Sequence, residues 1–375
     1  MQRQGRLRSA LSNMSSKTSE DSRGDIDTEI DKPRVVTFGE FLVRLAAPNH
    51  LLLEQASTLE VSFGGAEANV AVSLARFGVP VRYVTRVPDT PITRTGRRLM
   101  QGFHVDTSHF IIGGDRVGLY FVEPGIAQRP SRVVYDRTGS GMASIQTGDI
   151  LWRTALEGCT WFHTSGITPA LSESASASTM EAVIAAQASG LTVSLDLNYR
   201  AQLWQWSKNP GKVMADLVSH ADVVFSNEED LDKVFGIRVP HTTAHAEALD
   251  SQAYAPACKE FLERFPNLRE VAVTIRESES ASENYWSAVL ATREGFYCSQ
   301  RYRIAPVLDR IGAGDAFAAA SIRQMLSVSA DPQAVVEFAA AASCLKHSIR
   351  GDFNLVGVAD VARLAGGDGA GRIDR

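Results

Sequence analysis

The sequence predicts an α/β fold with a doubly wound, mostly parallel β-sheet. Strand-like runs are short and bounded by Gly, Asn, Pro or charged residues, and the apolar residues between them recur at helical spacing. The two patterns alternate along about 300 residues, which is typical of this fold class. In such a fold, ligands bind at the carboxyl ends of the strands.

Six runs rich in β-branched and aromatic residues are the expected buried parallel strands. They are residues 34–40, 81–87, 159–166, 191–198, 221–227 and 271–277. Two apolar stripes at helical spacing predict helices between or after these strands. The stripes consist of Val70, Leu74 and Phe77 before Gly78, and of Val335, Phe338, Ala339, Ala342 and Leu345.

Two segments, residues 41–63 and 117–139, depart from this alternation and look like antiparallel strand pairs inserted into the α/β body. We expect them to form a small β-sheet lid, although the pattern alone fits a decorating hairpin equally well. The α/β body and its insertions are expected to form one domain over residues 34–362. Residues 1–33 are polar and predict a disordered tail, and residues 363–375 predict a flexible one.

The composition is that of an ordinary globular protein, because 44% of the 375 residues are hydrophobic and 22% are charged. A net charge of -5 provides no basic surface for nucleic acid, and no apolar run approaches the roughly 20 residues of a membrane helix. The cysteines form no CxxC pair, so neither a zinc site nor a disulfide framework is expected. We therefore expect a cytoplasmic protein that binds neither nucleic acid nor a membrane.

The stretch DRIGAGDAFAAA, residues 309–320, carries the main chemical signal. Gly312, Ala313 and Gly314 leave the backbone N–H groups accessible, and a helix that begins there adds partial positive charge, so the turn can bind an anion such as phosphate. Asp315 beside it can accept a proton from an attacking hydroxyl. The pattern favours phosphoryl transfer to an alcohol, although these four residues alone fit an N-capped turn equally well.

Other catalytic motifs are missing from the sequence. There is no Walker loop, and the GxG here lacks the third glycine or alanine of a dinucleotide fingerprint. Protein-kinase HRD and DFG, metalloprotease HExxH and hydrolase GxSxG motifs are absent too. The sequence therefore lacks the residues that these enzyme classes require.

Three separated motifs are FGGAEANVAVSLARFG (63–78), SNEED (226–230) and DRIGAGDAFAAA (309–320). In order and spacing they resemble the motifs of the ribokinase-like (PfkB) carbohydrate kinases. Four further stretches resemble the 2-keto-3-deoxygluconate kinases of that family: GLYF (118–121), RVVYDR (132–137), SGITPAL (165–171) and DLNYRAQLW (196–204). The resemblance covers about residues 34–362.

The resemblance implies that Asp315 is the catalytic base and that Gly312, Ala313 and Gly314 form the anion hole. Positioning and charge stabilisation supply most of the acceleration in phosphoryl transfer. A carboxylate with a pKa near 4 is a weak base toward an alcohol, so we expect the proton to move late, as the oxygen bonds to phosphorus.

The resemblance also implies a sugar site. Gly64 and Gly65 let the sugar approach the backbone, Asn69 contacts hydroxyls, and Glu40 at the end of the first strand accepts sugar hydroxyls. A carboxylate on the substrate is expected to be held by Tyr120, Tyr135, Arg137 and Arg200, because arginines fork onto carboxylates. Taken singly, the glycine pair also fits helix packing, and Tyr120 or Tyr135 fits the core of the lid. Arg200 also fits a surface salt bridge.

For ATP and Mg²⁺, the resemblance implies Asn227, Glu228 and Asp230, which correspond to a motif that organises magnesium through water. These residues also fit a solvated charge run at a helix start. Gly312 and Gly314 are expected to bind the nucleotide phosphates, and Arg276 either joins them or pairs with Glu277 or Glu279. Asp309 matches the family, whereas Arg310 has no assigned role, and no residue of 344–354 is assigned to adenine.

The resemblance thus implies an ATP-dependent, Mg²⁺-requiring transferase of carbohydrate metabolism that phosphorylates the terminal hydroxyl of a sugar acid such as 2-keto-3-deoxygluconate. A fructokinase or ribokinase that takes a neutral sugar, or a non-catalytic sugar-acid sensor, remains an alternative. A requirement for a monovalent cation stays open. A homodimer formed through the lid is expected by analogy only.

Overall fold

The strands of the central sheet are hydrophobic on both faces because helices cover both. In β1, Val35 packs into one hydrophobic core and its neighbour Val36 into the other, as successive side chains of a strand point to opposite faces. The computed structural model describes residues 34–207, 209–227, 229–238, 251–327 and 330–369. The tail predicted over residues 1–33 lies outside the described residues.

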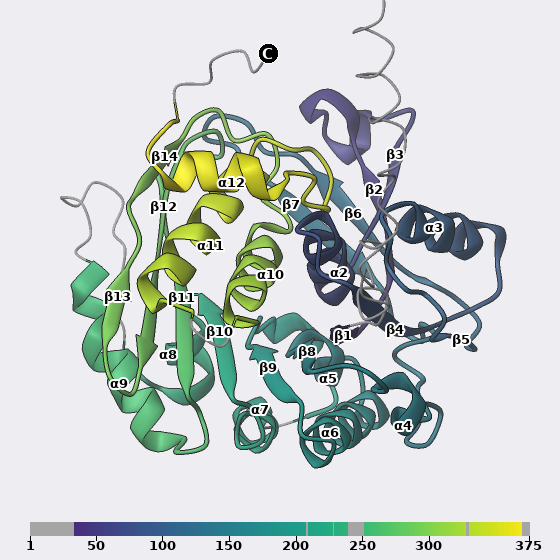
Figure 1. The fold of residues 1–375 in the computed structure, drawn as a ribbon. Helices are drawn as coiled ribbons and strands as arrows, with labels where there is room; N and C mark the ends of the chain where they lie inside the picture. Colours follow the sequence, from purple (N-terminus) through teal and green to yellow (C-terminus); the bar gives the residue numbers. More distant parts are fainter. Residues whose placement is uncertain (1–33, 208, 228, 239–250, 328–329, 370–375) are drawn as a thin grey trace, which may run out of the picture. The chain divides into compact units, whose positions relative to one another are not determined.

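Ten strands in the described ranges form this sheet. They are β1 (Val35–Phe38), β4 (Val81–Val87), β5 (Phe110–Ile112), β8 (Trp161–Ser165), β9 (Thr192–Asp196), β10 (Val223–Asn227), β11 (Glu270–Ser278), β12 (Asn284–Thr292), β13 (Phe296–Cys298) and β14 (Tyr302–Ile304). Their order is β13-β12-β11-β10-β9-β8-β1-β4-β5, with β14 paired to β12 (Figure 1).

The six predicted strands are all present, and they pair in parallel with one another where they are neighbours. The prediction of a mostly parallel sheet is therefore confirmed. The antiparallel part, β11 with β12 and β12 with β13 and β14, was not predicted, because its last strands are short and bounded by polar loops.

Helices on the two faces enclose the two cores. One core receives α4 (Trp152–Ala155), α5 (Ile167–Ala170), α6 (Glu173–Ala188), α7 (Pro210–Val218), α8 (Asp230–Phe235) and α9 (Ala255–Arg264). The other receives α2 (Ala66–Arg76), α3 (Pro91–Gly102), α10 (Ala313–Met325), α11 (Pro332–Lys346) and α12 (Val358–Ala365). Both predicted apolar stripes lie on helices, α2 and α11, and α10 lies between these two (Figure 1).

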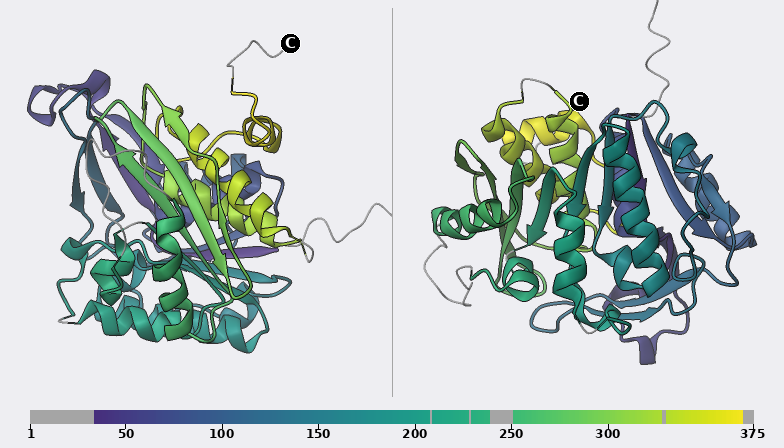
Figure 2. Two further views of the ribbon diagram at one scale, coloured as in Figure 1. Left: turned by 90° about the vertical axis from the view of Figure 1, so that its left-hand side faces the viewer. Right: turned by 90° about the horizontal axis from the view of Figure 1, so that it is seen from below.

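A second sheet of four strands contains the two inserted segments. Its strands are β2 (Leu42–Ala46), β3 (Glu60–Gly64), β6 (Gly118–Glu123) and β7 (Arg132–Asp136), in the order β3-β2-β6-β7. The pairs β2–β3 and β6–β7 are antiparallel as predicted, and β2 joins them by pairing in parallel with β6. We call these four strands the lid sheet; in the left view of Figure 2 its purple strands stand away from the teal helices.

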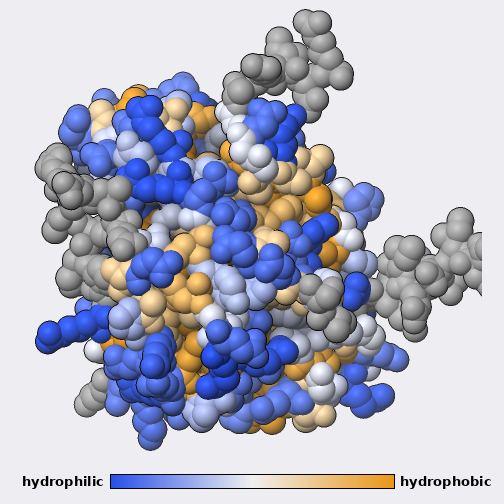
Figure 3. All heavy atoms as spheres, turned by 60° about the vertical axis from the view of Figure 1, so that its left-hand side comes forward, coloured by the Kyte–Doolittle hydropathy of each residue, from blue (hydrophilic) through white to orange (hydrophobic). Residues whose placement is uncertain are grey.

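The remaining connections include four short 3₁₀ helices, η1 (Pro48–His50), η2 (Leu53–Gln55), η3 (Ala201–Leu203) and η4 (Ser251–Tyr254). Helix α12 ends at Ala365, three residues beyond the predicted domain boundary at residue 362. Among the described residues, none of the helices is long and apolar enough to span a membrane. On the face in Figure 3, hydrophobic and hydrophilic side chains are interspersed.

Candidate active site

A cavity of about 730 Å³ lies where the parallel strands end, as the fold class predicts. Its wall includes Asp196 at the end of β9 and Asn227 at the end of β10. The first residues of α2 and α10 contribute as well, and the lid sheet adds Tyr120 and Tyr135. The cavity therefore brings together residues from both sheets and from two helix N-termini.

The turn Gly312–Gly314 faces this cavity. Gly312 has φ +85°, and a Cβ atom there would lie 2.1 Å from the carbonyl oxygen of Asp352, so only glycine fits. A Cβ added at Gly314 would meet no atom within 4 Å, so its backbone borders open space. These residues open α10, whose N-terminal N–H groups attract an anion.

Asp315 lies in the first turn of α10 and is buried, with 8% of its surface exposed. Its Oδ2 accepts a hydrogen bond of 2.7 Å from Nδ2 of Asn69 on α2. Burial raises the pKa of Asp315 to about 7, and the nearby carboxylates of Asp352 and Glu67 raise it as well. The expectation of a pKa near 4 is therefore wrong, because the sequence does not reveal the burial.

The glycine pair at the start of α2 has two separate functions. Gly65 lines the cavity with φ +129°, and a Cβ there would lie 2.1 Å from the carbonyl oxygen of Glu40. Gly64 is not among the cavity-lining residues; a Cβ there would lie 2.1 Å from Oδ2 of Asp352. Gly64 therefore makes room for Asp352. Asn69 lines the cavity, and its buried Oδ1 has no hydrogen-bond partner in the described structure.

Glu40 does not face the cavity, contrary to the sequence-based expectation. Its side chain is buried, and Oε2 accepts hydrogen bonds from Nε (2.7 Å) and Nη2 of Arg137, while Oε1 accepts one from Ser140. Arg137 lines the cavity and lies over the ring of Tyr135, with Cζ 5.3 Å from the ring centroid. The structure thus makes Glu40 the residue that orients Arg137.

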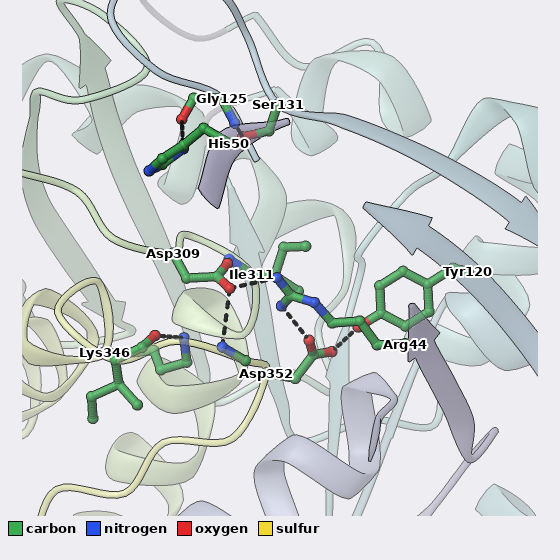
Figure 4. Close-up of polar contacts among 11 residues, drawn as sticks. Arg44, His50, Tyr120, Gly125, Ser131, Asp309, Ile311, Lys346 and Asp352 are labelled. Atoms are coloured by element: carbon green, nitrogen blue, oxygen red, sulfur yellow. Dashed lines mark hydrogen bonds and ion pairs between the residues drawn. The ribbon is translucent and has the colours of Figure 1, made fainter. Parts of the chain in front are cut away.

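A buried charge network connects the lid sheet to the loop before α10 (Figure 4). Arg44 on β2 donates to Asp309 at 2.6 Å and to Asp352 at 2.9 Å, and Tyr120 on β6 donates to Asp352 at 2.5 Å. Asp309 also accepts hydrogen bonds from the backbone N–H groups of Ile311 and Gly351, each at 3.1 Å. Asp352 lines the cavity, so it contributes to the site although no sequence motif indicates it.

Arg200 is exposed and lines the cavity. Within the described part of the chain it forms no ion pair, and its one hydrogen bond goes to the carbonyl oxygen of Tyr199 at 2.9 Å. The alternative of a surface salt bridge is therefore not observed. The positive charge of Arg200 acts on Asp196, Asp230 and Asp315, in each case lowering the carboxyl pKa.

The acidic motif at the end of β10 is partly ordered around Asn227. Nδ2 of Asn227 donates to Oδ2 of Asp230 at 2.9 Å, and this carboxylate also accepts the N–H of Tyr199 at 3.1 Å. Burial raises the pKa of Asp230 to about 6. Glu228 lies outside the described residues. No group of three or more His, Cys, Asp or Glu side chains placed to hold a metal occurs among the residues described.

Two guanidinium groups, Arg276 on β11 and Arg310 before α10, line the cavity near each other. Glu277, one of the partners considered for Arg276, instead pairs with Arg301 through hydrogen bonds of 2.8 and 3.0 Å. Burial and the neighbouring Arg276 lower the pKa of Arg310, whose Nη2 donates to the carbonyl oxygen of Ala281 at 3.0 Å. This part of the cavity therefore carries positive charge.

The segment 344–354 supplies two cavity residues that the sequence left unassigned, His347 and Asp352. The ring of His347 lies edge-on to Trp286, with centroids 5.0 Å apart, and the indole N–H of Trp286 has no hydrogen-bond partner in the described structure. The sequence indicates only that the turn residues GDF follow a long apolar helix. It did not indicate which side chain enters the cavity.

The comparisons with known proteins agree with the fold and the cavity. Residues 32–353 match the family described as pfkB family carbohydrate kinase. The chain is 32% identical over 345 residues to the 2-dehydro-3-deoxygalactonokinase of Haloferax volcanii, an alignment that covers 91% of this chain and 99% of that protein. It is 27% identical over 328 residues to the 2-dehydro-3-deoxygluconokinase of Thermoproteus tenax, covering 85% and 89%.

Among solved structures, the crystal structure of 2-dehydro-3-deoxygluconokinase from Thermotoga maritima superposes with a TM-score of 0.84 at 42% identity, covering 89% of this chain and 100% of that one. A PfkB family carbohydrate kinase from Listeria grayi superposes with a TM-score of 0.80 at 33% identity, covering 89% and 99%. Because the family match extends over well more than half of its length, the chain belongs to the pfkB family of carbohydrate kinases.

Proposed function

We propose that this kinase transfers the γ-phosphate of ATP to the terminal hydroxyl of 2-keto-3-deoxygluconate, which is also called 2-dehydro-3-deoxygluconate. One observation carries the proposal: the buried carboxyl group of Asp315 and the guanidinium of Arg200 line the same cavity as the glycine turn 312–314. A base, an anion-binding turn and a cation for a substrate carboxylate are what phosphorylation of a sugar acid requires.

Asp315 has the role of base in this proposal. A group with a pKa of about 7 is half ionised at neutral pH and is a stronger acceptor than an exposed carboxylate. Asn69 holds Oδ2 of Asp315 and leaves Oδ1 for the substrate hydroxyl. The unpartnered Oδ1 of Asn69 can accept a hydrogen bond from a second sugar hydroxyl.

The substrate carboxylate is assigned to Arg200 and Arg137. Arg137 uses Nε and Nη2 for Glu40, so its remaining Nη1 group can donate toward the cavity that it lines. Tyr135 lies beneath the guanidinium of Arg137, and Tyr120 is held by Asp352. With a neutral sugar, Arg200 has no anionic partner among the described residues, which supports an acidic substrate.

The nucleotide is assigned to the positively charged part of the cavity. Arg276 and Arg310 fit the phosphates of ATP, and the open space at Gly314 lets the γ-phosphate approach the backbone N–H groups that begin α10. When bound with the nucleotide, Mg²⁺ would supply positive charge to the phosphates. Asn227, Glu228 and Asp230 are proposed to hold its water shell, because Mg²⁺ keeps several waters and takes few protein ligands.

The galactonate epimer is the second candidate substrate, because one relative is named a 2-dehydro-3-deoxygalactonokinase. A product analysis tests the proposal. After incubation with Mg-ATP and 2-keto-3-deoxygluconate, the phosphorus NMR signal of the product should split with two methylene protons, as expected for phosphorylation of the terminal hydroxyl. A product phosphorylated on a secondary hydroxyl contradicts the proposed position, and unchanged sugar acid contradicts the proposed substrate.

We also propose that the lid sheet closes over the sugar and forms a homodimer interface. Val61 on β3 is 55% exposed and Val134 on β7 is 45% exposed, so both outer strands present hydrophobic side chains. Light scattering of the purified chain tests this, because Val134→Asp should shift a dimer to a monomer. A monomeric unsubstituted chain contradicts it.

A further inference from the structure

Lys346, the last residue of α11, is a buried lysine that no carboxylate contacts within the described ranges. None of its surface is exposed. Its ammonium donates one hydrogen bond, of 3.1 Å, to the carbonyl oxygen of Ile349, and the described residues provide no ion pair for it. Because an isolated charge is costly to bury, this lysine needs a compensating field.

That field comes from the carboxylates around the anion-binding turn. Burial lowers the pKa of Lys346, and Asp309, Asp352 and Asp315 each act in the opposite direction, which favours the charged ammonium. Arg44 already bridges Asp309 and Asp352. The two cations therefore balance these two carboxylates, and Figure 4 shows Lys346 on the other side of Asp309 from Tyr120.

The stem of Lys346 packs directly behind the turn. A Cβ atom built on Gly312 would lie 3.3 Å from Cε of Lys346. Two further hydrogen bonds connect the same region. The hydroxyl of Ser343 on α11 donates to the carbonyl oxygen of Ala313 at 2.7 Å, and the backbone N–H of Gly351 donates to Asp309 at 3.1 Å. Lys346 does not line the cavity, so it reaches the reaction only through the turn.

We propose that Lys346 is a positioning residue that serves as an internal monovalent cation, with its ammonium fixing the loop 349–352 and supplying positive charge behind the anion-binding turn 312–314. This inference rests on the proposed function, because it concerns the same turn. Charge that is fixed before the reaction stabilises the negative oxygens of the transition state without reorganisation. When the side chain is shortened to alanine, a small dissolved cation could enter the space that the ammonium leaves beside the carbonyl oxygen of Ile349.

Two consequences follow from this arrangement. The unsubstituted enzyme needs no added potassium or ammonium, because Lys346 already provides the charge. Loss of a donor that contacts the transition state costs about 10²–10³ in kcat, and a charge acting through the backbone should cost about tenfold to 10². The KM for the sugar should change little, because the sugar does not contact Lys346.

The test compares Lys346→Met, which fills the space without charge, with Lys346→Ala, which leaves a cavity. ADP release is measured in potassium, ammonium and choline chloride at equal ionic strength. Lys259→Met is the matched control, because the side chain of Lys259 is 78% exposed. We expect both Lys346 variants to lose kcat in choline chloride, and potassium or ammonium to restore Lys346→Ala alone.

The melting temperature provides a second readout that needs no substrate. Potassium or ammonium should raise it for Lys346→Ala relative to choline, and should leave Lys346→Met and the unsubstituted chain unchanged. Full kcat in Lys346→Met overturns the inference, and so does a Lys346→Ala variant that neither cation restores or stabilises. If the unsubstituted enzyme does not phosphorylate the sugar acid, the proposed function fails, and the melting temperatures still decide the cation site.

Discussion

Replacement of Asp315 by asparagine should abolish catalysis and stabilise the fold above neutral pH. Asparagine has the same size, and its side-chain oxygen can accept the hydrogen bond from Asn69 that Asp315 accepts at 2.7 Å. The change therefore removes the charge and leaves the contact. Asp315→Asn therefore tests the carboxylate charge separately from the packing of the side chain.

The size of the expected change in the free energy of unfolding follows from the pKa of Asp315. The pKa is about 7 in the folded protein, against an ordinary value of 3.8 for an aspartate in water, so folding raises it by about three pH units. Each unit corresponds to about 1.4 kcal/mol, which gives an upper limit of about 4 kcal/mol for the cost of the buried charge. Below about pH 4 the carboxyl group is protonated in both the folded and the unfolded state, so its burial costs no charge. Because the pKa is raised in the folded state, the free energy of unfolding falls as the pH rises from about 4 to about 7.

Urea denaturation at about pH 4 and pH 8 measures this cost. We expect Asp315→Asn to match the unsubstituted chain at the lower pH and to exceed it at the higher pH, by an amount below the upper limit. Asp216→Asn is the control, because Asp216 lies on the partly solvent-facing helix α7 and does not line the cavity. Equal pH dependence of the Asp315→Asn variant and the unsubstituted chain, or an Asp315→Asn variant that still releases ADP with sugar acid, refutes the reasoning.

Three further predictions concern the sugar site and its support. Arg200→Ala should raise the KM for the sugar acid by about tenfold to 10², because a hydrogen bond to a charged group contributes a free energy of that size. The KM for ATP should change less, and an equal rise in both KM values contradicts the proposed role of Arg200 in binding the carboxylate. Arg44→Met leaves two buried carboxylates without their partner, so its unfolding free energy, measured in urea, should fall by about 3–5 kcal/mol, and an unchanged value contradicts the network. Gly312→Ala should lose kcat because its Cβ meets the Asp352 carbonyl, whereas Gly148→Ala, with the same φ of +85° and no atom within 4 Å, should keep it.

The fold was largely predictable because its signals are local. Each of the six predicted strands is a short apolar run between turn residues, and every one is found in the sheet. The glycine turn and Asp315 were predictable because adjacent residues carry the whole pattern. Position 312 requires glycine because the turn before α10 gives this residue a positive φ.

The rest of the site depends on contacts between distant parts of the chain. Arg44 and Asp352 are 308 positions apart, and Tyr120 and Asp352 are 232 apart, so no local pattern relates them. The resemblance to the family assigns Glu40 to the sugar, and only the folded structure brings Arg137 to it from 97 positions away. The raised pKa of Asp315 likewise arises from burial, which is a property of the assembled cavity.

The central claim is that this cavity phosphorylates a sugar acid. Its most direct test is ADP release with Mg-ATP and each of four sugars: 2-keto-3-deoxygluconate, 2-keto-3-deoxygalactonate, fructose and ribose. Asp315→Asn serves as the inactive control. We expect a kcat/KM for one or both acids that exceeds the values for the neutral sugars by at least about 10², because Arg200 and Arg137 are proposed to bind the carboxylate. Equal or higher kcat/KM with fructose or ribose would contradict it.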